Sequence, residues 1–172
     1  FDGQDDYVNI PYTTELNSFS DQISVTTYFK VTGKVGEHRN IVTNGNVSGF
    51  AFTVSAENKL RPHIMVDTGW WYFDGQTTIE LDTWYHGAFV YDGATFNLYL
   101  DGELNGSQDG GSGNIINYND DLLIGKFPFN DIQNFPGFID HVTIWDRALT
   151  AYEIKESMLP SLTLLEEGLL GF

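Results

Sequence analysis

Short runs of alternating apolar and polar residues make up most of the chain, and turn dipeptides separate them. The runs 23–31, 49–56 and 96–102 place apolar side chains at every second position. Side chains alternate between the two faces of a strand, so each run predicts a strand with one buried face. Asp-Gly and Asn-Gly dipeptides, which tolerate the positive φ of tight hairpins, recur between the runs. This spacing predicts an all-β sandwich or barrel.

One segment near the C-terminus departs from this pattern. TAYEIKESML opens with Thr150 and carries Glu153 three residues later, which is the spacing of a capping box. A proline follows and ends the predicted helix. We therefore expect one domain over 1–159 and a separate segment over 160–172. The last segment is apolar but irregular, and it is compatible with an extra strand, a linker or a docking tail.

The charge of the chain restricts the class of partner. Eight Lys and Arg against 24 Asp and Glu give a net charge of -16 at pH 7. This field repels phosphates and anionic lipids, which disfavours nucleic-acid and membrane-surface partners. No run of 18 apolar residues is present, so we expect no membrane insertion. The absence of cysteine excludes disulfides, thiolate metal sites and a cysteine nucleophile.

Several motifs together resemble a known family. FDGQDDYVNIP opens the chain, LDTWYHGAFVYDGATFNLYLDGE covers 81–103, LLIGKF follows, and FPGFIDHVTIWDRALTAYEI covers 135–154. In this order they resemble the laminin-G-like, or concanavalin A-like lectin/glucanase, domains of bacterial secreted proteins over nearly all of 1–158. The resemblance implies a jelly-roll sandwich of two antiparallel sheets, an extracellular or cell-surface location and, in many members, a bound glycan and calcium. It does not supply the ligand, because this fold hosts many functions.

An acidic residue lies within the run FIDHVTIW. Regular alternation places Asp140 on one face with Phe138, Val142 and Ile144. An ionised carboxylate among apolar side chains is costly unless it has a partner. A hard cation such as calcium, which takes carboxylate and carbonyl oxygens, would be such a partner.

The resemblance indicates where the other calcium ligands would lie. In similar domains the matching aspartate helps to hold a calcium together with groups from the first strand. Here those groups would come from Asp2 and Gly3, with Asp5 or Asp6 as further candidates, and Asp140 would join them from the last strand. We expect a structural calcium that ties the two strands together. The alternative is that Asp140 accepts backbone N–H bonds at a strand end and binds no ion.

Four consecutive aromatic residues stand in the segment DTGWWYFDG. Alternation points Trp70 and Tyr72 to one face, and Trp71 and Phe73 to the other. Only one face of a one-sided sheet meets the core, so we expect one pair to fill the core and the other to form a platform. Sugars have apolar C–H faces that stack on flat aromatic rings. In the alternative, a loop covers the second pair and the whole row is core.

The preceding run, LRPHIMVD, supplies polar groups at alternate positions. If the aromatic row turns back on this run, its polar side chains and one aromatic pair line a common surface and orient sugar hydroxyls. The candidate ligand-binding residues are Arg61, His63, Asp67, Trp70, Trp71 and Tyr72. Asn44 and Asn46 are further candidates from a nearby loop.

We do not expect an enzyme. The resemblance includes retaining endoglucanases with the strand signature Glu-x-Asp-x-Glu, whose two carboxylates flank the scissile bond. The nearest match, IELDTW, has Glu80 and Asp82 but no second glutamate. The chain has no Gly-x-Ser-x-Gly nucleophile elbow, and its four histidines lack zinc spacing. Trp84 and His86 are assigned to the framework.

The sequence therefore predicts a non-catalytic carbohydrate-binding module of a larger secreted or surface protein. Its partner would be a polysaccharide or glycan, and neighbouring domains of a larger chain are further expected contacts. The alternative is a structural or protein-interaction module of an adhesin, a surface assembly or a phage particle.

Overall fold

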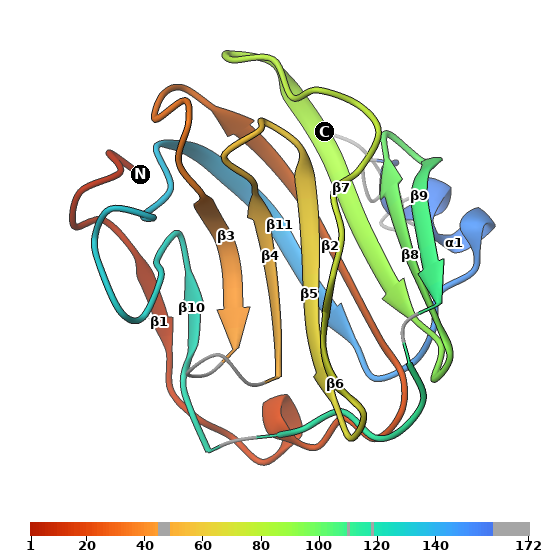
Figure 1. Cartoon of the computed structure of the whole chain (residues 1–172). Coiled ribbons are helices and arrows are strands. Elements are labelled where there is room, and N and C mark those ends of the chain that lie inside the picture. Colours follow the sequence, from red (N-terminus) through yellow and green to blue (C-terminus); the bar gives the residue numbers. More distant parts are fainter. Residues whose placement is uncertain (45–48, 110, 118, 160–172) are drawn as a thin grey trace, which may run out of the picture.

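Two antiparallel sheets pack face to face in the computed structural model, which describes residues 1–44, 49–109, 111–117 and 119–159 (Figure 1). One sheet has six strands in the order β1-β10-β3-β4-β5-β6, and the other has five in the order β11-β2-β7-β8-β9. The predicted all-β jelly-roll sandwich is thereby confirmed. The predicted segment 160–172 and Asn46 lie outside the described residues.

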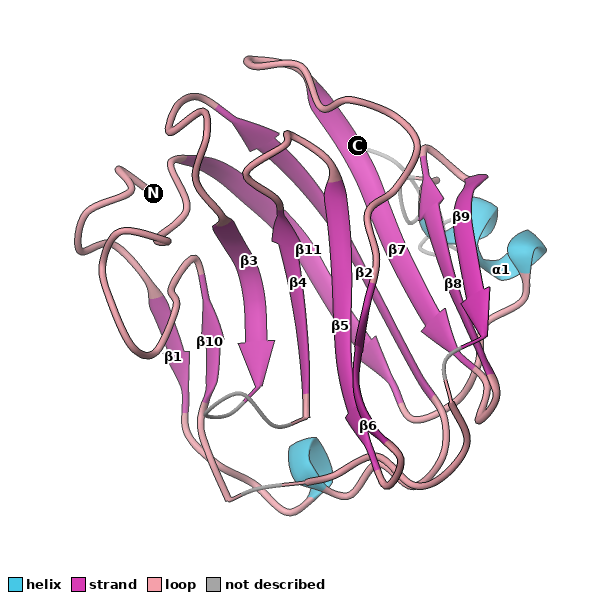
Figure 2. Cartoon of the chain, in the orientation of Figure 1, coloured by secondary structure: helices cyan, strands magenta, loops and turns pink. Residues whose placement is uncertain are grey.

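The strands follow the turn punctuation of the sequence. Their bounds are β1 (Val8–Ile10), β2 (Ile23–Val31), β3 (Arg39–Asn44), β4 (Phe50–Val54), β5 (Leu60–Val66), β6 (Gly69–Tyr72), β7 (Trp84–Tyr91), β8 (Thr95–Leu100), β9 (Glu103–Asp109), β10 (Leu122–Ile124) and β11 (Gly137–Trp145). The helices are the 3₁₀ turn η1 (Glu15–Asn17) and α1 (Ala151–Ser157) (Figure 2). Among the described residues, none of the helices is long and apolar enough to cross a membrane.

Aromatic side chains fill the space between the sheets. The Phe89 ring lies 5.2 Å from that of Phe52 and 5.5 Å from that of Phe96, with both pairs edge to face. All three are fully buried. Burying a phenylalanine side chain contributes about 2–3 kcal/mol to folding, and edge-to-face geometry adds to it. This shared core fixes which face of each strand remains for a ligand.

Helix α1 forms as the capping box predicts. The Thr150 hydroxyl accepts a hydrogen bond from the Glu153 amide, and the Glu153 carboxylate accepts one from the Thr150 amide at 2.8 Å. Ile154 is buried against Ala88 and Val90, which lie on the outer face of the five-stranded sheet. The helix therefore covers the β7 side of this face.

Strand β11 does not keep the predicted alternation. Its register with β2 shifts between Asp140 and Thr143, and His141 has a φ of 48°. Such a bulge inserts one extra residue, which moves every later side chain to the other face. Val142 and Ile144 pack against the core, whereas Asp140 lies on the outer face with its side chain 63% exposed. The premise that Asp140 shares a face with these apolar residues is wrong.

The first residues of the chain pair with the beginning of β11. The amino group of Phe1 donates to the Gly137 carbonyl at 2.9 Å, and the Gly137 amide donates to the Phe1 carbonyl at 2.8 Å. Asp2 forms an isolated bridge with Pro136. Backbone contacts therefore connect the first residues of the chain to the beginning of β11.

Candidate functional site

The hairpin of β5 and β6 divides the aromatic row between two environments. Trp71 lies opposite Ile64, which is fully buried, and Tyr72 lies opposite His63. Trp71 and Phe73 pack against the core between the sheets. Trp71 therefore does not belong to the surface that carries Tyr72, although the sequence made it a candidate ligand-binding residue.

The outer face of the six-stranded sheet is hollow beside this hairpin. Asn40, Thr43, Ala51 and Thr53 point outward from β3 and β4 and are only 1–7% exposed. They form the floor of a cavity of about 260 Å³. The lining residues are His38, Asn40, Thr43, Asn44, Phe50, Ala51, Thr53, Arg61, His63, Trp70, Tyr72, Phe127 and Gln133. Small side chains on the floor and large ones around it give the cavity its depth.

Three adjacent rings, those of Trp70, His63 and Tyr72, form one wall of the cavity. The His63 and Tyr72 rings are 5.4 Å apart and nearly parallel, at 27°. The centre of the Trp70 ring also lies 5.5 Å from that of His63, and the planes of these two rings are tilted by 40°. Tyr72 is 50% exposed. The wall thus offers apolar ring surface at the cavity mouth, where a sugar C–H face can stack.

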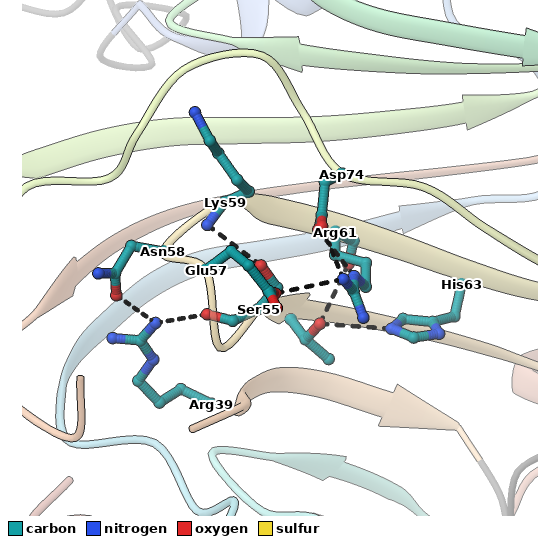
Figure 3. Close-up of polar contacts among 9 residues, drawn as sticks. Arg39, Ser55, Glu57, Asn58, Lys59, Arg61, His63 and Asp74 are labelled. Atoms are coloured by element: carbon teal, nitrogen blue, oxygen red, sulfur yellow. Dashed lines mark hydrogen bonds and ion pairs between the residues drawn. The ribbon is translucent and has the colours of Figure 1, made fainter. Parts of the chain in front are cut away.

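An ion pair fixes the polar end of this wall (Figure 3). The Arg61 guanidinium donates to both Asp74 carboxylate oxygens, at 2.7 and 2.6 Å, and its Cζ lies 5.4 Å from the Tyr72 ring. The hydrogen bonds that Arg61 donates to the Asp74 carboxylate raise the pKa of Arg61. Burial alone would raise the pKa of Asp74, but the bonds from Arg61 outweigh it and lower that pKa. Asp74 therefore holds Arg61 charged and in a single orientation, as a bidentate pair does.

His63 is a neutral polar group inside the cavity. Its burial, reinforced by the charge of Arg61, lowers its pKa to about 3. Its Nε2 lies 3.4 Å from the Thr53 hydroxyl, whereas its buried Nδ1 has no hydrogen-bond partner among the described residues. An unpaired buried nitrogen costs about 1–3 kcal/mol.

Asp67 and Asn44, the other candidates from this region, have different positions. Asp67 follows β5 at the hairpin turn and accepts hydrogen bonds from Asn114, through the amide at 2.9 Å and the side chain at 3.3 Å. Asp67 does not line the cavity, and its hydrogen bonds hold the segment around Asn114 to the hairpin. Asn44 does line the cavity.

Several residues that line the cavity are not among the candidates predicted from the sequence. Asn40, Thr43 and Thr53 were detectable as polar positions on otherwise apolar strands. Phe127 and Gln133 come from the segment between β10 and β11 and carry no periodic signal. Only the tertiary structure, in which this segment lies beside β3, brings them to the cavity.

The predicted metal ligands do not form one group. Carboxylate oxygens of Asp2, Asp5 and Asp6 lie within 4.8 Å of one another, at the exposed N-terminal turn that contains Gly3. Asp140 is not part of this group, and its carboxylate pairs with the His141 ring at 3.0 Å. The hydrogen bond from the Gln4 amide lowers the pKa of Asp2, which favours its ionised form.

Glu80 and Asp82 are the nearest match in the sequence to a pair of glycosidase carboxylates. Both lie in the connection between β6 and β7, are exposed, and do not line the cavity. The cavity contains no carboxylate among its lining residues in the described part of the chain. Its chemistry is that of amides, hydroxyls, imidazoles and one guanidinium, which suits binding by hydrogen bonds and stacking.

Comparison with known proteins agrees with this architecture. A family model described as the concanavalin A-like lectin/glucanases superfamily matches residues 2–155. None of the curated proteins matches the chain.

Solved structures share the fold at low sequence identity. The binding domain of Paraclostridial Mosquitocidal Protein 1 superposes with a TM-score of 0.74 at 17% identity, over 91% of this chain and 41% of that one. A putative carbohydrate binding protein from Bacteroides ovatus gives 0.71 at 18%, over 87% and 44%. Domain 4 of AbnA, an extracellular arabinanase from Geobacillus stearothermophilus in complex with arabinotriose, gives 0.68 at 21%, over 91% and 74%. The chain spans less than half the length of the first two structures.

Proposed function

The chain belongs to the concanavalin A-like lectin/glucanase superfamily, and on that basis we propose that it is a non-catalytic carbohydrate-binding module. The observation that carries the proposal is the cavity on the outer face of the six-stranded sheet. It combines the ring wall of Trp70, His63 and Tyr72 with a floor of buried polar side chains. Such a combination of apolar faces and a few placed polar groups is typical of ligand sites.

Each part of the cavity has a role in holding a sugar. The Tyr72 and Trp70 rings would stack on the C–H face of a pyranose or furanose ring. Asn40 and Gln133 would exchange hydrogen bonds with its hydroxyls, since an amide both donates and accepts. The guanidinium of Arg61, fixed by its ion pair, would set the orientation of the ligand at the cavity mouth.

The similar proteins support a glycan ligand and an extracellular setting. Domain 4 of an extracellular arabinanase was solved with arabinotriose, and the Bacteroides ovatus protein is described as a putative carbohydrate binding protein. We propose that the chain is likewise one module of a secreted or surface protein, next to other domains. Screening against a panel of glycans would identify its ligand.

The experiment is a glycan panel in native affinity gels, followed by calorimetry with the best ligand. We expect Trp70→Ala and Tyr72→Ala each to weaken binding about 10- to 30-fold, since a central aromatic contact contributes about 1.4–2 kcal/mol. Tyr152→Ala is the matched control, because Tyr152 is 70% exposed on α1 and remote from the cavity. Unchanged binding by both cavity variants would refute the site. No retardation by any glycan would favour the protein-interaction module.

We also propose that calcium binds at the N-terminal turn. Three close carboxylates of like charge repel one another, and a divalent cation that takes oxygen ligands would relieve this repulsion. Calcium in excess should raise the melting temperature by about 3–8 °C over a chelator. Asp5→Asn with Asp6→Asn should abolish this shift, whereas Asp140→Asn should keep it. A shift that depends on Asp140 would restore the ligand set predicted from the sequence.

A further inference from the structure

The outer face of the five-stranded sheet carries a second aromatic surface. The register of β11 and β7 with β2 places outward side chains in rows, each across three strands. Phe138, Lys30 and Trp84 form one row, and Trp145 stands about 20 Å further along, at six residues of 3.3–3.4 Å each. Trp84 and Trp145 are 47% and 39% exposed. Trp84, which the sequence analysis assigned to the framework, thus presents an exposed ring on this face.

The bulge at His141 builds this surface. With regular alternation, Val142 and Ile144 would follow Asp140 on the outer face. The extra residue at φ 48° instead brings Thr143 and Trp145 outward. A positive φ is uncommon and unfavourable for a residue other than glycine, and bulges occur next to functional sites, where they redirect side chains.

A groove of about 600 Å³ lies between the two tryptophans and the end of α1. Tyr28 forms part of its floor and donates a hydrogen bond to the Met158 carbonyl at 2.7 Å, which fixes the distance between the helix end and the sheet. His86, 2% exposed, also lines the floor, and its buried Nδ1 has no partner among the described residues. A groove with aromatic ends and a buried, unpaired polar group has the composition of a ligand site.

The groove and the cavity on the other sheet differ in the charged side chains that line them, and Arg61 of the cavity is paired with Asp74. Asp140 and Glu156 line the groove, and its lining, all within the described part of the chain, contains no lysine or arginine. The cavity on the six-stranded sheet contains Arg61 and no carboxylate among its described lining residues. Next to the groove, the Lys30 ammonium lies 4.6 Å from the Phe138 ring and 5.5 Å from the Trp84 ring. The surroundings therefore already accommodate an ammonium group on aromatic rings.

We propose that this groove is a second ligand site, which binds a chain of amino sugars that carry free ammonium groups. The sugar rings stack on Trp145 and Trp84, and the ammonium groups pair with the carboxylates of Asp140 and Glu156. The net charge of -16 attracts such a polycation from a distance. This site does not depend on the cavity of the proposed function, and it takes a ligand of different charge.

Calorimetry with three matched oligosaccharides tests the proposal on the full chain. The probes are β-1,4-linked tetramers of glucosamine, N-acetylglucosamine and glucose, which share one backbone and of which only the glucosamine tetramer carries ammonium groups. We expect the glucosamine tetramer to bind at least tenfold more tightly than the other two, and more weakly as salt is added. Trp145→Ala and Asp140→Asn should each weaken it at least fivefold. Trp70→Ala, which disables the other cavity, should leave it unchanged.

One control variant separates binding at this site from nonspecific electrostatic attraction. Asp109→Asn removes one exposed negative charge from β9, at the far edge of the same sheet, and should have no effect. Equal affinity for the N-acetylated tetramer, or equal losses in Asp109→Asn and Asp140→Asn, would overturn the proposal. So would binding that appears only after removal of residues 160–172, because that segment would then be the occupant of the groove. Failure of the other cavity to bind any glycan would leave these readouts intact.

Discussion

Replacing Trp71 by alanine is expected to lower the free energy of unfolding by about 3–5 kcal/mol, as large-to-small core substitutions do. The same change at Trp70 should cost less than about 1 kcal/mol, because Trp70 lies on the outer face. Trp71 packs against the core opposite Ile64. A side chain built on Gly111 would collide with its indole, so the segment at Gly111 covers it from outside. Trp71 thus serves stability, whereas Trp70 is left for the binding role proposed above.

Urea denaturation of both variants measures this difference. The midpoint should fall strongly for Trp71→Ala and little for Trp70→Ala, with the slope m unchanged in both. Trp71→Phe keeps part of the apolar volume and should lose less stability than Trp71→Ala. Glycan affinity should respond in the opposite way, with Trp70→Ala weakened and folded Trp71→Phe near wild type. Equal destabilisation at both positions would show that the hairpin register is not the one described.

Acid should destabilise the protein before its carboxylates titrate, because the buried His86 and the partly buried His63 are held in their neutral form. Burial lowers the pKa of His63 to about 3 and that of His86 to about 4. Above pH 6.5 both are neutral in the folded and the unfolded chain, so they add no pH dependence. Below pH 6.5 the unfolded chain binds protons that the folded chain does not, so stability falls as the pH falls. At about 1.36 kcal/mol per pH unit, each residue removes about 2 kcal/mol by pH 5.

Unfolding curves between pH 7 and pH 4.5 test this effect. His63→Gln and His86→Gln should each flatten the dependence of unfolding free energy on pH, and the double variant should flatten it most. His141→Gln is the matched control, because the His141 side chain is 76% exposed. A wild-type free energy that stays constant down to pH 5 would contradict the burial of both rings. Glycan affinity should remain constant between pH 5 and 8, since His63 stays neutral throughout this range.

The sequence by itself determined the elements that depend on local periodicity. Period-two alternation is a property of the extended backbone, so Phe96 and Leu98 could be assigned to the buried face of their strand, and both are fully buried. The capping box of Thr150 and Glu153 involves groups three residues apart, and it forms as read. The division of the aromatic row into two pairs follows from the same alternation. Each of these features involves neighbours in the chain.

Only the tertiary structure decided which of these features meet. The bulge at His141 could not be assigned from the alternation of side chains, because the extra residue has an ordinary side chain and only its φ is unusual. Because of this single residue, the end of β11 turns the opposite face to the core from the one predicted, and Asp140 lies on the outer surface rather than beside core residues. The cavity likewise needs Phe127 and Gln133 from the segment between β10 and β11, where the Gln133 carbonyl accepts a hydrogen bond from the Asn40 amide of β3. Contacts between distant segments depend on the summed packing of the whole chain, and no window of sequence contains that information.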